Sequence, residues 1–278
     1  MGIRKFKPTT PGVRQMSMST FEEITKRWPE KSLLMNIKKH AGRNSRGKIT
    51  VRHRGSGAKR MYRMVDFNQT DKLGIEGKVA AIEYDPNRTA YIMLVIYRDG
   101  EKRYHIAPEG IKVGASILTK EKAKIKTGNR ITLKNIPVGY SIHNVELYEK
   151  KGGKLARTAG TSLKLVSLEG TYAQLQMPSG EIRMVSKGCF ASIGIVSNAE
   201  HNNIVIGKAG RSRHMGRRPV VRGTAMNPKD HPHGGGEGRT GIGLKHPKTP
   251  WGMAALGFKT RKRKYTNKWI VRSRHLAK

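Results

Sequence analysis

Short apolar segments run through the middle of the chain, and residues typical of turns separate them. A first series covers residues 79–84, 90–97 and 103–107, with Asp85-Pro86-Asn87-Arg88 and Asp99-Gly100 between them. Apolar segments of this length with Asp, Asn, Pro and Gly between them predict a meander of β-strands.

A second series of strand-like segments follows a polar stretch near residues 120–128. Apolar Ala173, Leu175 and Met177 alternate with polar positions in this series, as expected for a strand with one buried face. Its segments cover residues 141–148, 161–168, 172–177 and 181–185, and turn signals separate them. Two groups of roughly five short strands predict a mainly β chain with two small barrels in tandem. Barrels of about 65–70 residues are marginal alone, so we expect them to pack on each other or on a partner.

The two ends of the chain differ from this centre. Residues 36–60 and 201–265 are rich in Gly, Asn, Arg, Lys and His and show little apolar periodicity, which predicts disorder in isolation. We therefore predict four parts: a basic N-terminal extension (1–59), a first barrel (60–125), a second barrel (126–197) and a Gly/Arg/His-rich C-terminal extension (198–278).

Charge separates these parts further. The 278 residues include 56 Lys and Arg against 19 Asp and Glu, a formal net charge of +37. Residues 1–60 carry +13, residues 61–200 carry +7 and residues 201–278 carry +17. A compact protein with this excess repels itself, so we expect a polyanion, either nucleic acid or an anionic membrane surface, to neutralise it.

Several classes of protein are disfavoured. Cys189 is the only cysteine, which excludes disulfide frameworks and multi-cysteine zinc sites. No apolar run approaches the ~18 residues of a membrane span, and residues 1–8 lack the apolar stretch of a secretory signal. We expect a cytoplasmic protein that is used at full length and does not bind membranes. Phosphate-binding loop patterns are missing too, which argues against a nucleotide hydrolase.

Two basic stretches are candidate nucleic-acid contacts. Residues 52–60 form a Gly-containing basic loop that leads into Tyr62 and Arg63 at the expected rim of the first barrel, where single strands dock on such barrels. Residues 207–218 alternate small residues with cations and contain no carboxylate, so they could thread between RNA strands. The alternatives are a flexible linker for the first stretch and a solvated face for the second.

Residues 226–239 contain the richest group of polar side chains. Asp230, His231, His233 and Glu237 could be metal ligands or an acid–base pair. A zinc site needs three or four ligands in a closed geometry, and the sequence does not supply them. We therefore predict no metal site and no catalytic residue, with His231 as a weak candidate only. We expect the imidazoles to contact nucleotides while Gly234, Gly235 and Gly236 let the backbone approach them.

Blocks of residues spread over nearly the whole length of the chain resemble one family. Glu83-Tyr84-Asp85-Pro86-Asn87-Arg88 is one such block, and the others cover residues 7–12, 42–44, 62–67, 135–139, 155–160, 222–239 and 245–252. In these blocks the chain resembles the bacterial type of the universal large-subunit ribosomal protein family L-two (uL-two). Residues 16–39 follow no recognisable pattern of that family.

The resemblance implies an OB-fold barrel followed by an SH3-like barrel, with the extensions threading into large-subunit rRNA near the peptidyl transferase centre. Members of the family are primary rRNA binders needed for subunit assembly and joining, and they support tRNA binding and peptide-bond formation. The implied partners are large-subunit rRNA, neighbouring ribosomal proteins, the small subunit across the interface, and tRNA nearby. His231 matches a histidine once proposed to assist catalysis, and the implied reaction centre is RNA, so we expect no enzyme activity from the protein itself.

The residues that we expect to bind rRNA are Arg52, His53, Arg54, Lys59, Arg60, Tyr62, Arg63, Arg88, Arg157, Lys208, Arg211, Arg213, Arg217, Arg218, Arg222, Asn227, His231, His233, Gly234, Gly235, Gly236, Arg239, Lys245, Trp251, Arg261, Lys262 and Arg263. We expect no cofactor beyond Mg²⁺ ions that associate with the rRNA. Two other classes stay open: a metal- or His-dependent transferase or nuclease, and a general architectural nucleic-acid binder with equal affinity for duplex DNA and any RNA.

Overall fold

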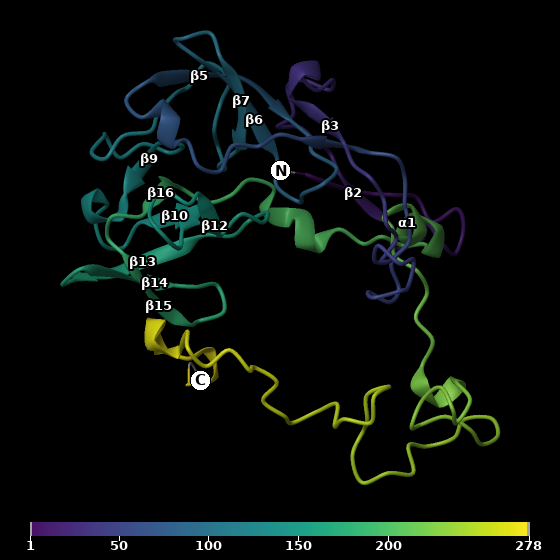
Figure 1. Cartoon of the computed structure of the whole chain (residues 1–278). Helices are drawn as coiled ribbons and strands as arrows, with labels where there is room; N and C mark the ends of the chain where they lie inside the picture. Colours follow the sequence, from purple (N-terminus) through teal and green to yellow (C-terminus); the bar gives the residue numbers. More distant parts are fainter. Residues whose placement is uncertain (1, 277–278) are drawn as a thin grey trace. The chain divides into compact units, whose positions relative to one another are not determined.

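A computed structural model describes residues 2–276, and the fold is mainly β (Figure 1). The chain divides into two compact units. Unit 1 consists of residues 1–38, 59–211 and 268–278, and unit 2 consists of residues 39–58 and 212–267. Among residues 2–276, no helix has the length and apolar character needed to cross a membrane.

The first barrel of unit 1 is built on an antiparallel sheet in the order β7-β6-β5-β8. Its strands are β5 (Glu76–Glu83), β6 (Ile92–Tyr97), β7 (Lys102–Ile106) and β8 (Ser116–Leu118). The three predicted strands of this region are confirmed, with ends shifted by a few residues. Val79, Met93 and Val95 are buried in its core, since alternate positions of these strands face inward.

The second barrel forms a sheet in the order β17-β15-β14-β13-β10-β16-β9. Its strands are β9 (Arg130–Thr132), β10 (Ser141–His143), β13 (Leu163–Glu169), β14 (Tyr172–Gln176), β15 (Ile182–Ser186), β16 (Phe190–Ile193) and β17 (Ile270–Arg272). A small ladder joins β11 (Val145–Glu146) to β12 (Gly153–Leu155). Strands β13, β14 and β15 lie side by side in Figure 1, and Leu165, Ala173 and Leu175 are fully buried beneath them.

Buried charges fix one side of the second barrel. Arg130 and Glu146 are both fully buried, and the Arg130 guanidinium donates to the Glu146 carboxylate at 2.9 Å and to the Asn144 carbonyl at 2.8 Å. Glu146 also accepts the backbone N–H groups of Phe190 and Lys150 at 3.1 Å each. The carboxylate therefore ties β9, β11 and β16 together.

The two barrels contact each other directly, which agrees with the expectation from their small size. Pro108 and Val196 form an antiparallel bridge. The Asn198 side chain donates to the Thr89 carbonyl at 2.6 Å, and the Ala159 N–H donates to the Thr89 hydroxyl at 3.0 Å. Apolar Ala90, Ile106 and Val196 are buried at the same place.

Parts of both basic extensions belong to unit 1. Strand β1 (Ile3–Lys5) pairs with β2 (Ser17–Ser19), and β3 (Leu34–Asn36) pairs with β4 (Met61–Arg63). These pairings place part of residues 16–39, for which the sequence suggested no role. Near the other terminus, β17 adds to the edge of β15. The four-part division of the chain stays a prediction. The two compact units divide the chain differently, since parts of both basic extensions belong to unit 1.

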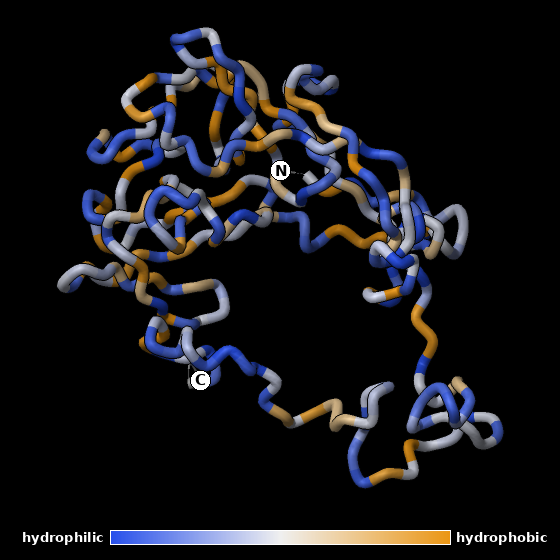
Figure 2. The backbone as a smooth tube through the Cα atoms, viewed as in Figure 1, coloured by the Kyte–Doolittle hydropathy of each residue, from blue (hydrophilic) through white to orange (hydrophobic). Residues whose placement is uncertain are grey.

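Unit 2 has a different character. It contains nineteen Lys and Arg residues against two acidic ones, Asp230 and Glu237. The buried hydrophobic residues that the structure describes all lie in unit 1. In Figure 2 the hydrophobic colour recurs along the strands of the two sheets. The 3₁₀ turn Gly223–Ala225, the end of helix α1 (Ala209–His214) and the start of the 3₁₀ turn Asn267–Trp269 are the regular elements of unit 2 within residues 2–276.

Candidate nucleic-acid interface

The two basic stretches that the sequence singled out lie side by side in unit 2. Arg54 and Arg217 form an antiparallel bridge. The Gly55 N–H donates to the Gly216 carbonyl at 2.7 Å, and the Ala58 N–H donates to the His214 carbonyl at 2.8 Å. We call residues 52–58 together with residues 213–218 the paired loops. They bring Arg52, Arg54, Arg213, Arg217 and Arg218 onto one surface without a carboxylate.

A glycine permits this close pairing. Gly57 has φ of +64°, and a Cβ atom at this position would lie 2.7 Å from the His214 carbonyl oxygen. A left-handed backbone with so little space is open only to glycine. The glycines of the first stretch are therefore already required for contact between the paired loops.

Among residues 2–276, the cations of unit 2 have no acidic partners. Every ion pair among residues 2–276 lies in unit 1, and none includes a residue of unit 2. Arg52, Arg54, Arg213, Arg217 and Arg218 are all exposed. Mutual repulsion makes this surface unfavourable alone and favours a bound polyanion.

The rim of the first barrel carries a second set of predicted contacts. Arg60 is exposed and donates to the Pro86 carbonyl at 3.0 Å, and Tyr62 and Arg63 lie on the half-buried strand β4. Arg88 pairs with the buried Asp85 at 2.5 Å. The charge of Arg88 is therefore largely offset inside the protein, which the sequence did not indicate.

Arg157 differs from Arg88 although both lie on the same aromatic ring. The guanidinium carbons of Arg157 and Arg88 lie 4.5 and 5.6 Å from the centroid of Phe67. Arg157 is exposed and makes no ion pair among the described residues. The ring orients this guanidinium while its N–H groups stay free for a phosphate.

His231 lies inside a compact loop of residues 222–235, which we call the His231 loop. Only 8% of the residue is exposed, and its ring lies against Gly223, where a Cβ atom would be 2.5 Å from the ring. Its Nδ1 accepts the His233 N–H at 3.0 Å. The expectation that His231 contacts nucleotides stays a prediction, but this geometry gives the ring a structural role within the His231 loop.

The three glycines at positions 234–236 also stabilise the His231 loop. Gly234 donates to the His231 carbonyl at 2.9 Å, and Gly235 donates to the Met226 carbonyl at 3.0 Å. A Cβ atom on Gly234 would overlap the Asn227 carbonyl, and Gly235 and Gly236 have φ of +93° and +85°. These glycines are required by the turn itself, whatever they approach outside it.

His233 connects the His231 loop to a hairpin that carries Trp251. The Lys248 N–H donates to Nε2 of His233 at 2.8 Å. Lys248 and Ala254 form an antiparallel bridge, and the Gly252 N–H donates to the Thr249 carbonyl at 2.9 Å across the tip. Trp251 lies at this tip with 76% of its surface exposed. An indole held in this way suits stacking on an unpaired base.

The remaining predicted contacts are dispersed. Lys208, Arg222, Asn227, Arg239, Lys245, Arg261, Lys262 and Arg263 are exposed, as are Lys59 and His53. Arg211 is half-buried, and its guanidinium donates to the Ser17 carbonyl at 2.9 Å. Asp230, His231, His233 and Glu237 do not converge: residues 2–276 contain no group of three or more His, Cys, Asp or Glu side chains that could hold a metal ion.

Two family models match the chain. Residues 30–119 match "Ribosomal Proteins L2, RNA binding N-terminal domain", and residues 126–252 match "Ribosomal Proteins L2, C-terminal domain". The chain belongs to the L-two family of ribosomal proteins. Its first barrel is accordingly the OB-fold and its second the SH3-like barrel, and the chain is a structural, RNA-binding protein of the large ribosomal subunit. The gap between the two matches falls within the polar stretch that separates the two predicted strand series.

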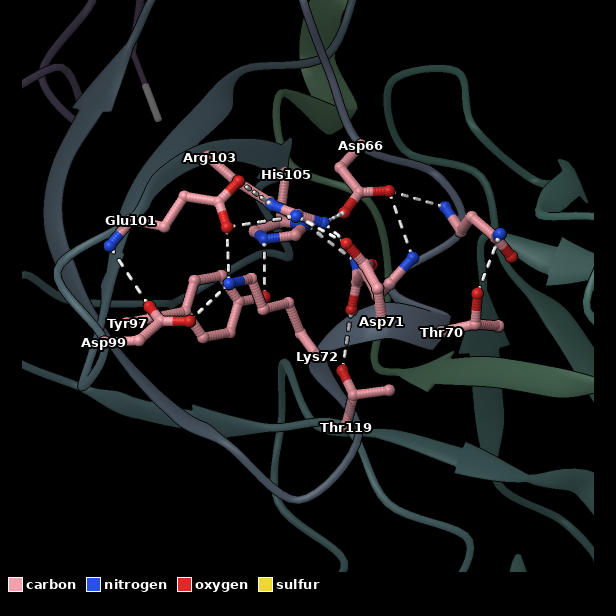
Figure 3. Close-up of polar contacts among 12 residues, drawn as sticks. Asp66, Thr70, Asp71, Lys72, Tyr97, Asp99, Glu101, Arg103, His105 and Thr119 are labelled. Carbon is pink, nitrogen blue, oxygen red and sulfur yellow. Dashed lines mark hydrogen bonds and ion pairs between the residues drawn. The ribbon is translucent and has the colours of Figure 1, made fainter.

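The OB-fold barrel of this L-two chain carries a network of charged side chains that the sequence did not predict (Figure 3). Arg103 donates to Asp66 at 2.8 Å and to Asp71 at 2.5 Å, and Lys72 pairs with Asp99 and Glu101. The side chains of Lys72 and Arg103 are 8% and 18% exposed, whereas those of Asp71 and Glu101 are 61% and 47% exposed. Lys72 and Arg103 are thus largely covered while Asp71 and Glu101 face solvent, so this face repels phosphate.

Neutral groups lie beneath this network. Gln69 donates to Nδ1 of His105 at 2.7 Å, and Nε2 of His105 lies 3.0 Å from the Tyr97 hydroxyl. Burial lowers the pKa of His105 to about 4, and burial raises the pKa of Tyr97. The sequence did contain a signal, because 14 of the 19 acidic residues fall in residues 61–200. Composition could not show that several of them share one face.

Proposed function

We propose that this chain is a primary rRNA-binding protein needed for assembly of the large subunit and its joining to the small subunit. We further propose that its C-terminal extension lies close to the peptidyl transferase centre and supports tRNA binding and peptide-bond formation. The observation that carries the proposal is the carboxylate-free surface of the paired loops in a unit that contains nineteen cations and no buried hydrophobic core.

The mechanism is electrostatic and depends on shape. Arg and Lys neutralise phosphates and release condensed counterions, which makes binding salt-dependent. Exposed Trp251 and the paired loops fit irregular, unpaired parts of RNA better than a regular duplex, whose narrow major groove excludes side chains. Mg²⁺ ions would belong to the packed phosphates of the rRNA rather than to a protein site.

His231 supports this function indirectly. Its ring packs on Gly223 and accepts a hydrogen bond from a backbone N–H. Removal of the ring would therefore destabilise the His231 loop, which positions Asn227 and the hairpin. Supporting peptide-bond formation by organising nucleotides requires no proton transfer by the protein. Neighbouring ribosomal proteins, the small subunit and tRNA are partners that we propose on the family resemblance alone.

Reconstitution of large subunits from purified rRNA and proteins tests the proposal. Particles are assembled with the wild-type chain, without it, and with His231→Ala, and assembly, subunit joining and peptide-bond formation are scored separately. We expect omission to block assembly or joining, and His231→Ala particles to retain most peptide-bond formation once assembled. Normal assembly of His231→Ala particles with loss of the chemistry would instead place His231 in the reaction.

A competition experiment separates this proposal from a general architectural nucleic-acid binder. Duplex DNA and unrelated RNA are added to the complex with large-subunit rRNA at constant salt. We expect neither competitor to displace the rRNA at equal nucleotide concentration, because single-stranded loops with splayed bases supply contacts that a duplex lacks. Equal competition by duplex DNA would favour the architectural binder.

A further inference from the structure

Unit 2 contains a recess of about 420 Å³ beside the paired loops. Ile49 and Val51 line it, and both are exposed, at 61% and 49%. The basic side chains around them are Arg43, Arg52, Arg54 and Arg218. The volume falls in the range of roughly 300–1,000 Å³ that is typical of sites for small ligands.

The backbone of unit 2 shapes this recess. The N–H groups of Thr50 and Val51 donate to the Gly42 carbonyl at 2.9 and 3.1 Å, which closes the loop that carries the apolar side chains. On the opposite side, the Arg218 N–H donates to the His53 carbonyl at 3.0 Å. The recess therefore needs both segments of unit 2, although they lie far apart in the sequence.

The lining combines two chemical characters. Ile49 and Val51 offer an apolar surface that no backbone phosphate requires, and the surrounding arginines offer charge and bidentate hydrogen bonding that suit phosphate. No carboxylate lies in the lining. A nucleotide presents both characters in one residue, since its base has apolar faces and its phosphate is an anion. A nucleotide within a duplex cannot enter, because its base is stacked and paired.

We propose that this recess binds one unpaired nucleotide of the rRNA, with the base against Ile49 and Val51 and the phosphate on the surrounding arginines. The proposal rests on the proposed function, because it assumes that unit 2 contacts rRNA. It adds a contact that distinguishes an extruded base from regular backbone, and thereby gives the basic loop a role in selecting where it binds.

The variant Ile49→Thr/Val51→Thr tests the apolar part of the recess. Threonine keeps the branched shape and the charge but replaces apolar surface with a hydroxyl. The matched control is Val220→Thr, since Val220 is 71% exposed in the same unit and does not line the recess. The full chain is bound to large-subunit rRNA across a salt series, and base-specific chemical probing then reports each unpaired nucleotide.

We expect the double variant to bind roughly three- to tenfold more weakly than the wild type, because hydroxyl groups replace part of the apolar surface that would cover the base. The slope of log affinity against log salt should not change, because no cation is removed. One unpaired nucleotide should gain reactivity while the rest of the footprint stays. Val220→Thr should change neither affinity nor footprint.

Arg52→Gln tests the charged part, with Arg46→Gln as a control in the same loop outside the recess. Both variants should reduce the magnitude of the salt slope by about 1 or less if each cation meets a phosphate. Only Arg52→Gln should expose the same nucleotide that Ile49→Thr/Val51→Thr exposes. The proposal is overturned if neither Ile49→Thr/Val51→Thr nor Arg52→Gln increases the reactivity of a single unpaired nucleotide. It is also overturned if these variants lose protection along the whole RNA.

Failure of the proposed function would look different. The wild-type chain would then bind large-subunit rRNA without a salt dependence or a footprint, before any variant is compared. Binding of a free nucleotide is tested separately by titrating adenosine 5′-monophosphate into the chain without RNA. We expect no saturable binding at micromolar concentration, and such binding would assign the recess to a free nucleotide and overturn the RNA assignment.

Discussion

At the scale of single residues, glycines and histidines have roles that composition does not reveal. Gly57 and Gly47 both have positive φ, at +64° and +74°, yet only Gly57 lies against another segment. His143 and His105 are buried as neutral side chains in the two barrels, unlike the exposed His53 of the paired loops. Residue type alone therefore says little about whether a side chain supports the fold or faces a partner.

Gly57→Ala should weaken rRNA binding more than Gly47→Ala. Both substitutions place an alanine in a left-handed conformation, which costs on the order of 1–3 kcal/mol, but only the first also meets the His214 carbonyl. Because the clash separates the paired loops, we expect the additional loss in a filter-binding titration with large-subunit rRNA. Equal losses for both variants would mean that the pairing contributes nothing to binding.

Stability should fall between pH 6.5 and pH 4. Burial lowers the pKa of His143 and of His105 to about 4 from an ordinary value of 6.5. Below pH 6.5 the unfolded chain therefore binds protons that the folded chain does not, so the unfolding free energy decreases as pH falls toward 4 and is fully present above 6.5. Each histidine accounts for roughly 3 kcal/mol over that interval.

Thermal unfolding of the full chain at several pH values measures this dependence. In His143→Asn the contribution of one histidine is absent, so the midpoint should change less between pH 7 and pH 4 than in the wild type. A variant with the same pH dependence as the wild type would show that His143 protonates as readily in the folded chain as in the unfolded one.

At the scale of elements, a buried ion pair holds the second barrel together and a strand from the C-terminal end completes its sheet. Glu146 lies on β11 and receives hydrogen bonds from groups of β9 and β16. Strand β17 adds to β15, and Trp269 packs edge to face on Tyr172 with ring centroids 5.3 Å apart. The chain thus returns to unit 1 after the excursion through unit 2.

Glu146→Gln should destabilise the chain by about 3–5 kcal/mol, because it leaves the charge of Arg130 buried without a partner. Its matched control is Glu121→Gln, which breaks the pair with Lys134 at 3.4 Å. Those side chains are 69% and 51% exposed, and such surface pairs contribute less than about 1 kcal/mol. Urea unfolding followed by circular dichroism compares the two, and similar losses would contradict this account of Arg130.

At the scale of the whole molecule, opposite charges are sorted onto different parts. Unit 2 carries nineteen cations against two acidic residues, while Asp71 and Glu101 of the network in Figure 3 are exposed on the OB-fold barrel. RNA should therefore bind through unit 2 and the barrel rim near Arg157, and it should avoid the face that carries Asp71 and Glu101.

The salt dependence of binding should follow this sorting. If the chain neutralises about 10 phosphates, log affinity should fall with log salt at a slope of roughly −7 to −9. Arg217→Gln/Arg218→Gln should reduce the magnitude of that slope by about 2 or slightly less. Arg98→Gln should not change it, because Arg98 pairs with Glu76 on the OB-fold barrel. A slope near zero in the wild type would exclude the electrostatic mechanism altogether.

The strand series, the two barrels and the basic ends could all be predicted from the sequence. Alternation in residues 172–177 predicts β14 because side chains of a strand point to opposite faces, and that rule depends on local geometry alone. Charge is equally independent of conformation, so the sequence could identify a partner of opposite charge. The blocks that resemble the L-two family could be read in the same way, and the family matches agree with them.

Which of these residues act together depends instead on contacts formed in the folded chain. Arg54 meets Arg217, His231 packs on Gly223, and Arg88 is paired with Asp85 while Arg157 is free on the same ring. Each of these facts depends on contacts between positions that are not periodic in the sequence. Local propensity cannot encode them, because long-range pairing is set by how the whole chain closes and by the burial and hydrogen bonding that closure creates.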